Sequence, residues 1–412
     1  MNDYIALTEI IDYYLNSEDF NGLPILKMSH YNEKELFELI DRGMIEVISE
    51  NEVLNPHIRG FNLNISIEVQ KKYISDKKTH ACLYPTETAL KEIEVDYKSP
   101  YTVLMQSGRG QFDIIYFDIE ILERYINNPK YIVYDSGYRG TIEINHDFYN
   151  EYAENEYIKD YGMAYVKDEP LIRSMGVFLI DLSNLPPKIQ MLWNAYELEN
   201  QKLYTIEEGF IKNLLHGEWV TKYWIFHALI DEMIIVNEQC KAMGIPSLFS
   251  KTFGTHYFDM PEGYRNILLP TMKNYYDFVL VMEKMFVHNI SVKTFQKDEF
   301  LIKKIERKDE NGNPKGSLVM FQEWLSKNIR TSNNLNLDII QPLKNIRKIR
   351  QVPAHELTNN KYDTTLYEKQ RDLVIETYTA VRNIRLIFSN HPLGSAVEIP
   401  KQLISGENIV YY

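Results

Sequence analysis

The chain has 412 residues, of which 44% are apolar and 25% are charged, which is ordinary globular usage. This length predicts a multidomain protein, and the composition excludes extended disorder and fibrous repeats. No run approaches about eighteen consecutive apolar residues, and no basic segment precedes an apolar core at the N-terminus, so we expect no membrane segment. The two cysteines, Cys82 and Cys240, offer neither a disulfide framework nor a zinc cluster, and a cytoplasmic location fits best.

The net charge of −13 is unevenly distributed. Residues 271–412 carry 21 Lys and Arg against 16 Asp and Glu, so the excess of acidic residues lies entirely in 1–270. Within the C-terminal third, 326–355 holds six cations and a single acid, Asp338. Binding of phosphates requires clustered Lys and Arg. We therefore expect any contact with an anion to involve this segment.

Residues 1–95 are predicted to form a winged-helix-like α+β segment. The sequence predicts helices over 7–17 and 33–42, a strand over 44–49 and a turn at 50–56. A helix pair followed by a small hairpin suits a winged helix. However, 1–60 contains twelve acids and four Lys and Arg, which disfavours DNA binding and a role as a transcriptional regulator.

Residues 96–200 are predicted to form a mixed α/β region. The runs YTVLMQ, FDIIYF, YIVYDSGYRGTIEI and GVFLIDL indicate short strands of a mixed sheet, with a helix at 118–126. The glycine-containing stretch SGRGQ at 107–111 lacks the Lys and Ser/Thr of a phosphate-binding loop, and a hairpin turn is the favoured interpretation.

Residues 201–270 are predicted to be a helical connecting region. It follows a helix at 187–199 and contains a long helix near 207–239. His227 and Asp231 have i, i+4 spacing and could share a metal ion. Two ligands do not make a metal site, and the apolar surroundings favour a core histidine bonded to a neighbour.

Residues 271–395 are predicted to form an all-α helical bundle, followed by a tail at 396–412. The final long helix is expected to begin with a capping box from Thr365 to Glu368. The predicted elements are helices at 275–290, 317–329, from about 336, and at 364–389, with a hairpin at 309–316.

One motif in this bundle carries chemistry. It reads Arg350-Gln351-Val352-Pro353-Ala354-His355, an arginine followed by a polar residue and, after four intervening residues, a histidine. Similar spacings occur at Arg139…His146 and Arg385…His391. Only Arg350…His355 combines a polar residue after the arginine with a basic neighbourhood inside a helical bundle. The C-terminal segment therefore resembles the HEPN family, helical bundles of which many are metal-independent ribonucleases in toxin–antitoxin and phage-defence systems.

The resemblance implies that Arg350 and His355 are catalytic, with Gln351 in the polar position, and that no metal or other cofactor is needed. It also implies a homodimer that assembles the active site through the C-terminal bundle, and an RNA substrate. We add Lys344 and Arg347 as RNA-positioning residues, for which a solvated basic helix edge is the alternative.

The resemblance implies a metal-independent HEPN-type endoribonuclease in phage defence by abortive infection, or in a toxin–antitoxin system, and we expect the N-terminal domains to be regulatory. A regulatory partner protein or a phage trigger would then be a further partner. The alternative is a noncatalytic HEPN-like module that binds nucleotide or mediates protein assembly, with N-terminal domains that sense a signal.

Helical geometry makes a separate prediction for Arg350. At about 100° per residue, one face of the motif helix is apolar and Arg350 projects within it. Burial of an unpaired cation is costly, so this face suits a dimer seam with an anion pocket. Alternatively, Arg350 extends past its neighbours or pairs with a core carboxylate such as Glu356. The apolar residues of this face are Ile339, Ile340, Leu343, Ile346 and Ile349.

Pro353 lies between the two candidate catalytic residues. In an ideal helix Arg350 and His355 would point about 140° apart. Because proline cannot donate to the carbonyl of Ile349, we expect a kink or bulge that turns His355 toward the cleft of Arg350. The alternative is that Pro353 ends the helix and His355 lies in a loop.

Overall fold

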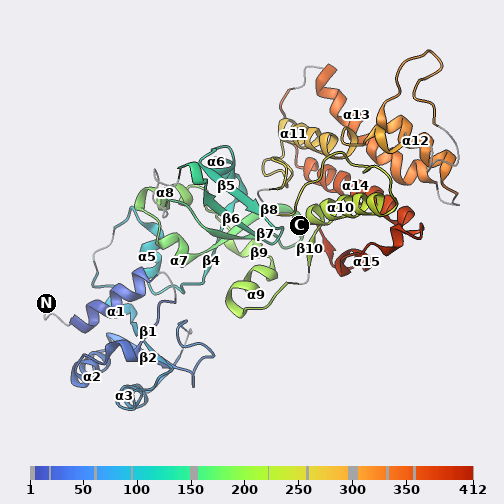
Figure 1. Ribbon diagram of the computed structural model, residues 1–412. Helices are drawn as coiled ribbons and strands as arrows, with labels where there is room; N and C mark the ends of the chain where they lie inside the picture. Colours follow the sequence, from blue (N-terminus) through green and yellow to red (C-terminus); the bar gives the residue numbers. More distant parts are fainter. Residues whose placement is uncertain are drawn as a thin grey trace. The chain divides into compact units, whose positions relative to one another are not determined.

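The computed structural model of the chain divides into two compact units (Figure 1). Unit 1 comprises 1–133, 139–167 and 173–207, and unit 2 comprises 134–138, 168–172 and 208–412. Both helices and sheets are present, which confirms the predicted α+β class. The structure describes residues 5–17, 20–59, 63–93, 96–148, 156–220, 222–256, 259–295, 305–330, 334–355 and 359–411, with the backbone alone at 170, 354 and 355.

The N-terminal part of unit 1 is a small antiparallel sheet with helices. Its sheet has the order β1-β3-β2, and its core contains Ile10, Leu39, Val47 and Leu83. The elements are α1 (Ile5–Asn16), β1 (Leu23–Pro24), α2 (Glu33–Asp41), β2 (Ile45–Ser49), α3 (Ile67–Ser75), β3 (Ala81–Pro85) and α4 (Glu87–Leu90). Because α3 lies between β2 and β3, the hairpin expected directly after the turn at 50–56 is not formed there.

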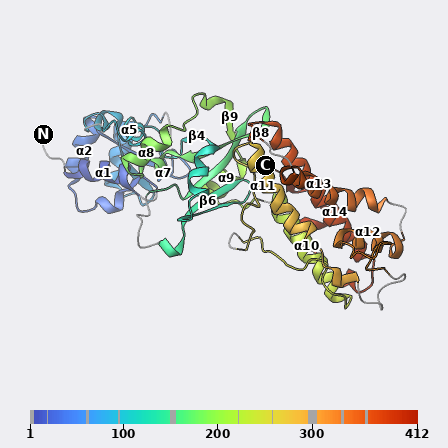
Figure 2. The same cartoon turned by 90° about the horizontal axis from the view of Figure 1, so that it is seen from above.

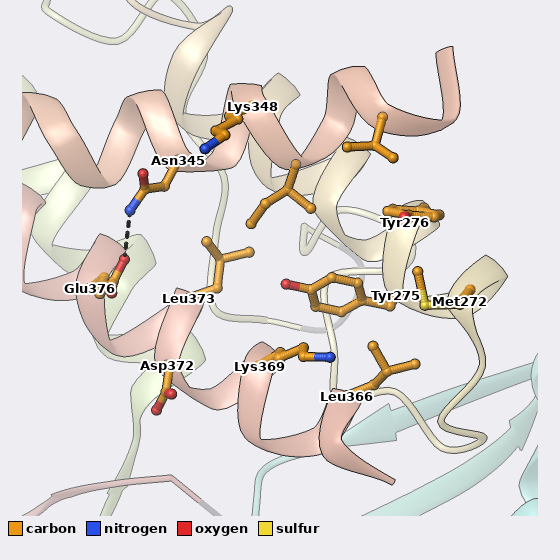
Figure 3. A pocket seen from close by; sticks show the side chains of 12 residues that line it. Met272, Tyr275, Tyr276, Asn345, Lys348, Leu366, Lys369, Asp372, Leu373 and Glu376 are labelled. Atoms are coloured by element: carbon orange, nitrogen blue, oxygen red, sulfur yellow. Dashed lines mark hydrogen bonds between the residues drawn. The ribbon is translucent and has the colours of Figure 1, made fainter. Parts of the chain in front are cut away.

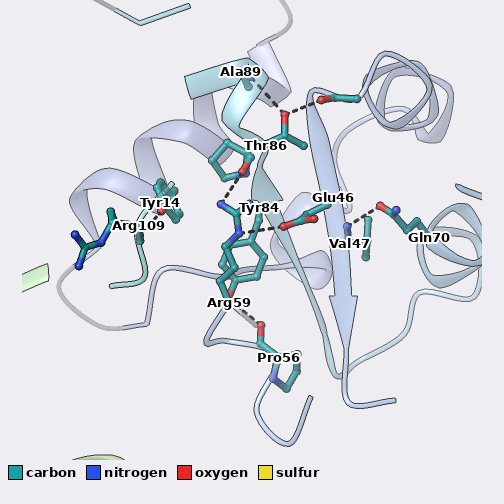
Figure 4. Close-up of polar contacts among 12 residues, drawn as sticks. Tyr14, Glu46, Val47, Pro56, Arg59, Gln70, Tyr84, Thr86, Ala89 and Arg109 are labelled. Carbon is teal, nitrogen blue, oxygen red and sulfur yellow. Dashed lines mark hydrogen bonds and ion pairs between the residues drawn. The ribbon is translucent and has the colours of Figure 1, made fainter. Parts of the chain in front are cut away.

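Side-chain contacts tie the irregular segments of this part to the sheet (Figure 4). Arg59 forms an ion pair with Glu46 on β2, Nε to Oε1, at 3.1 Å. Gln70 on α3 accepts a hydrogen bond from the backbone N–H of Val47 at 2.9 Å. These contacts hold α3 and the segment before it against β2.

The rest of unit 1 contains most of a six-stranded sheet with the order β4-β8-β7-β6-β5, in which β9 also pairs with β7. Its strands are β4 (Ile114–Asp118), β5 (Tyr131–Asp135), β6 (Arg139–Ile144), β7 (Asp160–Val166), β8 (Glu169–Phe178) and β9 (Tyr204–Ile206). Its helices are α5 (Pro100–Gln106), η2 (Ile119–Leu122), α6 (Glu123–Ile126), α7 (Leu179–Ser183) and α8 (Pro187–Asn194). The predicted helix at 118–126 corresponds to η2 and α6.

Two predictions for this region differ from the structure. YTVLMQ forms helix α5 instead of a strand, because Pro100 occupies the first helical turn and Tyr101 and Met105, four residues apart, are both buried. SGRGQ at 107–111 consequently connects a helix to strand β4 instead of two strands. The boundary predicted at 95/96 lies inside unit 1, where the hydroxyl of Tyr14 donates to the carbonyl of Arg109.

Unit 2 is mainly helical, and one hydrophobic core runs through it. Helix α10 packs along α14, and α11, α13 and α14 contact one another (Figures 1 and 2). The helices are α9 (Glu208–His216), α10 (Ile225–Ala242), α11 (Met272–Met282), α12 (Ser317–Asn328), α13 (Gln341–His355), α14 (Thr365–Ser389) and α15 (Lys401–Ser405). The π-helical turns η5 (Glu283–Val287) and η8 (Asn336–Ile340) adjoin α11 and α13, and β10 (Tyr223–Trp224) pairs with β11 (Ile409–Val410).

The predicted connecting region and tail are largely parts of this unit. The helix expected over 207–239 is divided into α9 and α10, because Gly217, at φ 66°, follows the last residue of α9 in the left-handed conformation that ends helices. Helix α10 belongs to the core of unit 2. In the predicted tail, Leu403 is fully buried. The bundle therefore extends beyond 271–395 at both ends.

An ion pair in the centre of unit 2 predicts a large effect on stability. Arg385 on α14 donates to both carboxylate oxygens of Glu232 on α10, and both side chains are almost fully buried. We expect Arg385→Met to lower the free energy of unfolding by about 3–5 kcal/mol, because the buried carboxylate loses its counter-charge. Chemical denaturation measures this. Arg371→Met, at an exposed position of the same helix, is the control and should change stability by less than about 0.5 kcal/mol.

Candidate functional site

The motif helix is formed as predicted, and its apolar face is buried. The π-helical turn η8 leads into α13, and Ile339, Ile340, Leu343 and Ile346 are at most 1% exposed. Arg350 follows on the same face, where its side chain remains 39% exposed. The arginine therefore lies at the point where the buried face of α13 reaches the surface.

Arg350 pairs with a buried carboxylate that the sequence did not single out. Its Nε lies 3.1 Å from Oε2 of Glu283, whose side chain is 2% exposed. The contact is an ion pair without the alignment of a hydrogen bond, and no described residue donates a hydrogen bond to this oxygen. Within the described residues, neither terminal nitrogen of Arg350 has a partner. The guanidinium thus contacts Glu283 through Nε, and its terminal nitrogens make no hydrogen bond to another described residue.

The same carboxylate lies beside a histidine. Nε2 of His288 is 3.5 Å from Oε1 of Glu283, and the imidazole is 59% exposed. In a regular α-helix, side chains five residues apart point about 140° away from each other. Here the backbone N–H of His288 donates to the carbonyl of Glu283 at 2.9 Å, which closes a π turn and brings the two side chains to one side.

The residue after His288 fixes the end of this helix. The backbone N–H of Lys251 donates to the side-chain carbonyl of Asn289 at 2.7 Å, and the Asn289 amide donates to the carbonyl of Lys251 at the same distance. Ser250, the residue before Lys251, is bound to Asn289 as well, because its backbone N–H donates to the backbone carbonyl of Asn289. His288 is therefore an exposed imidazole on an anchored backbone.

Lys344, Arg347 and Gln351 on the motif helix have different surroundings. Lys344 donates from Nζ to Oε1 of Gln322 on α12 at 2.8 Å, so it is part of a helix–helix contact. Arg347 and Gln351 are exposed. Lys344 thus contacts α12 while Arg347 and Gln351 lie in solvent, and the role of the three residues in RNA binding stays a prediction.

Helix α13 includes Pro353 and ends at His355. His355 thus has a helical backbone, which differs from the loop expected if Pro353 ended the helix. The side chain of His355 and the whole of Glu356 lie outside the described residues. The predicted pairing of Arg350 with His355 is accordingly still a prediction.

A groove of about 480 Å³ lies between α11, α13 and α14 (Figure 3). Its apolar walls include Ile349 and Leu373, and Tyr275 and Tyr276 supply aromatic rings whose centroids are 6.1 Å apart. Burial raises the pKa of Tyr275 to about 12, so its hydroxyl stays protonated near neutral pH. The rim is charged and consists of Lys348, Lys369, Asp372 and Glu376.

The two other arginine–histidine spacings have structural explanations. Arg139 donates to Asp160 across neighbouring strands from both Nε and a terminal nitrogen. Arg385 is bound by Glu232 and by the carbonyl of Leu403. Among the three arginines, Arg350 alone keeps both terminal nitrogens without a partner in the described part of the chain.

The predicted pair His227 and Asp231 does not form one site. The Tyr134 hydroxyl lies 3.1 Å from Nε2 of His227, and Asp231 accepts a 2.6 Å hydrogen bond from Tyr223. Burial lowers the pKa of His227 to about 4, which agrees with a core histidine. Across the described residues, no group of three or more His, Cys, Asp or Glu side chains could hold a metal ion. None of the described helices has the length and apolar character needed to cross a membrane.

Comparisons with family models, with curated proteins and with solved structures found no match to this chain. The interpretation of the site therefore depends on its own geometry and on the sequence motif.

Sequence reasoning missed Glu283 and His288. A signal for Glu283 was present, since the acid lies between Met282 and Phe286 on the apolar face of an amphipathic helix, where a carboxylate needs a partner. His288 had no comparable signal, because a regular helix would point it away from Glu283.

The ion pair can be tested by its coupling energy. We expect a double-mutant cycle with Glu283→Gln and Arg350→Met to give about 1–3 kcal/mol, because the buried carboxylate depends on the arginine for its counter-charge. Chemical denaturation of the four proteins measures it. The exposed pair Lys273 and Asp277, 2.8 Å apart, is the control and should show no measurable coupling. A coupling energy near zero for Glu283 and Arg350 would contradict the assigned contact.

Proposed function

We propose that the C-terminal bundle is a metal-independent HEPN-type endoribonuclease and that Arg350 binds the scissile phosphate. The observation that supports this proposal is the ion pair with Glu283, which contacts Arg350 at Nε while the arginine side chain stays 39% exposed. A guanidinium fixed in this way can donate two parallel hydrogen bonds to phosphate oxygens without losing its charge.

The basic character of the segment supports an anionic substrate. Lys348 and Arg347 are exposed on α13, and the cations of 326–355 far outnumber its acids. Phosphate contacts of this kind position a nucleic acid without reading its sequence. RNA is the proposed substrate because its 2′-hydroxyl can serve as an internal nucleophile.

The chemistry requires one stabilised charge and two proton transfers. As the 2′-oxygen attacks phosphorus, its proton passes to a base, and the departing 5′-oxygen receives a proton from an acid. Arg350 would stabilise the negative charge on the phosphorane. His355, as the resemblance implies, would carry one of the protons, because imidazole changes protonation state near neutral pH.

The resemblance also supports the wider role. We propose phage defence by abortive infection, or a toxin–antitoxin system, as the setting, with a homodimer formed through the bundle and with unit 1 in regulation. A regulatory protein or a phage component would then control the activity.

RNA cleavage in the presence of EDTA tests the enzyme. We expect the wild type to cleave single-stranded RNA with EDTA present, and Arg350→Ala and His355→Ala to lose about 100-fold or more of the rate, as is typical for loss of charge stabilisation or of proton transfer. Arg371→Ala is the control. Absence of cleavage by the wild type, or cleavage unaffected by Arg350→Ala, would refute the proposal.

The groove favours a second candidate, a noncatalytic nucleotide-binding module. Its volume lies within the range of small-molecule sites, and its aromatic walls with an ammonium group at the rim suit a planar base attached to a phosphate. In this candidate Tyr276 would contact the base and Lys348 the phosphate.

Calorimetric titration with nucleoside 5′-monophosphates tests this candidate. Since base stacking on an aromatic ring contributes about 1–3 kcal/mol, Tyr276→Ala should weaken binding about tenfold or more. Lys348→Ala should also weaken it. Tyr97→Ala, at an exposed tyrosine of unit 1, is the control. Absence of binding, or equal affinity for all variants, would exclude the groove as a nucleotide site.

A further inference from the structure

The cluster around Glu283 contains a proton carrier that the motif does not include. Arg350 and His288 come from different helices, yet both contact the same carboxylate, Arg350 at Oε2 and His288 at Oε1. The two oxygens of one carboxylate are close together, so the guanidinium and the imidazole lie within reach of a single bound phosphodiester.

The orientation of the imidazole suits proton transfer. Nε2 of His288 faces Glu283, and within the described residues Nδ1 has no hydrogen-bond partner. With 59% of its side chain exposed, His288 can present Nδ1 to a substrate. The anchored Asn289 next to it limits the movement of the backbone. Such fixed positions favour efficient proton transfer.

We propose that His288 is a catalytic residue and acts as the general base of the RNA cleavage. This inference depends on the proposed function. Nδ1 takes the proton of the 2′-hydroxyl as the bond between the 2′-oxygen and phosphorus forms. The bond from phosphorus to the 5′-oxygen breaks, and that oxygen receives its proton from the acid, which the motif assigns to His355. The products are a 2′,3′-cyclic phosphate and a 5′-hydroxyl.

Glu283 supports the assignment of His288 as the general base. A general base becomes positively charged as it takes the proton, and a carboxylate behind the imidazole stabilises that charge. Arg350 compensates the carboxylate before the proton arrives. Both oxygens of Glu283 therefore contact groups that carry positive charge during the reaction.

Imidazole rescue tests this role. We expect His288→Ala to lower kcat about 100-fold or more with KM changed less than about threefold. Added imidazole should raise the rate of the His288→Ala variant at least about tenfold, because the exposed site can admit it. A merely structural histidine would show no such rescue.

His30 provides a matched control. Its Nε2 also lies 3.5 Å from a glutamate, Glu9, and its side chain is 58% exposed, but no arginine shares that carboxylate among the described residues. His30→Ala should cleave RNA at the wild-type rate and show no response to imidazole. If the wild type cleaves and His288→Ala is as active as His30→Ala, or is inactive without rescue, the role of His288 is refuted while the nuclease stands. If the wild type does not cleave RNA, both proposals fail.

Discussion

A carboxylate buried in an apolar helix face needs a positive partner, and the helices around Glu283 provide it. Because an isolated buried charge costs far more than a typical packing contact contributes, the side chain of Glu283 constrains what can lie opposite it. Unit 2 contains a second such carboxylate, Glu232, whose arginine is buried with it. The two pairs differ in exposure. Arg385 is enclosed and holds α10 to α14, whereas the side chain of Arg350 is 39% exposed.

The π turn at Glu283–Val287 determines which side chains share this carboxylate. One extra residue in the turn places His288 beside Glu283, although an α-helical turn would separate them by about 140°. A proline kink was expected to do the same for Arg350 and His355 on α13. On α11 and η5 a π turn brings Glu283 and His288 together, in a segment that contains no proline or glycine.

Local sequence patterns predicted much of unit 2 because its helices bury regular stripes of apolar residues. Helices at 317–329 and 364–389 agree closely with α12 and α14, and the predicted apolar face across η8 and α13 is buried at Ile339, Ile340, Leu343 and Ile346 and half-buried at Ile349. The predictions failed where long-range contacts decide the structure. YTVLMQ became a helix, and β2 pairs with a strand that lies beyond α3. Neither outcome is encoded in the periodicity of a short window, which assumes a regular repeat and near neighbours.

The sequence indicated Arg350 but not its partner Glu283, because this contact is also long-range, and not the nearby His288, because its position depends on the π turn. Spacing selected three arginines, and in the structure each pairs with a carboxylate from a different part of the chain, so spacing and pairing fail to distinguish them. The hydrogen bonds made by the terminal nitrogens do distinguish them, and these bonds depend on packing. Arg139 and Arg385 use these nitrogens within the fold, while Arg350 leaves them available in the part of the chain that the structure describes. A partly exposed cation that a buried carboxylate holds in place is suited to binding phosphate, and the role proposed for Arg350 depends on this arrangement as well as on the motif.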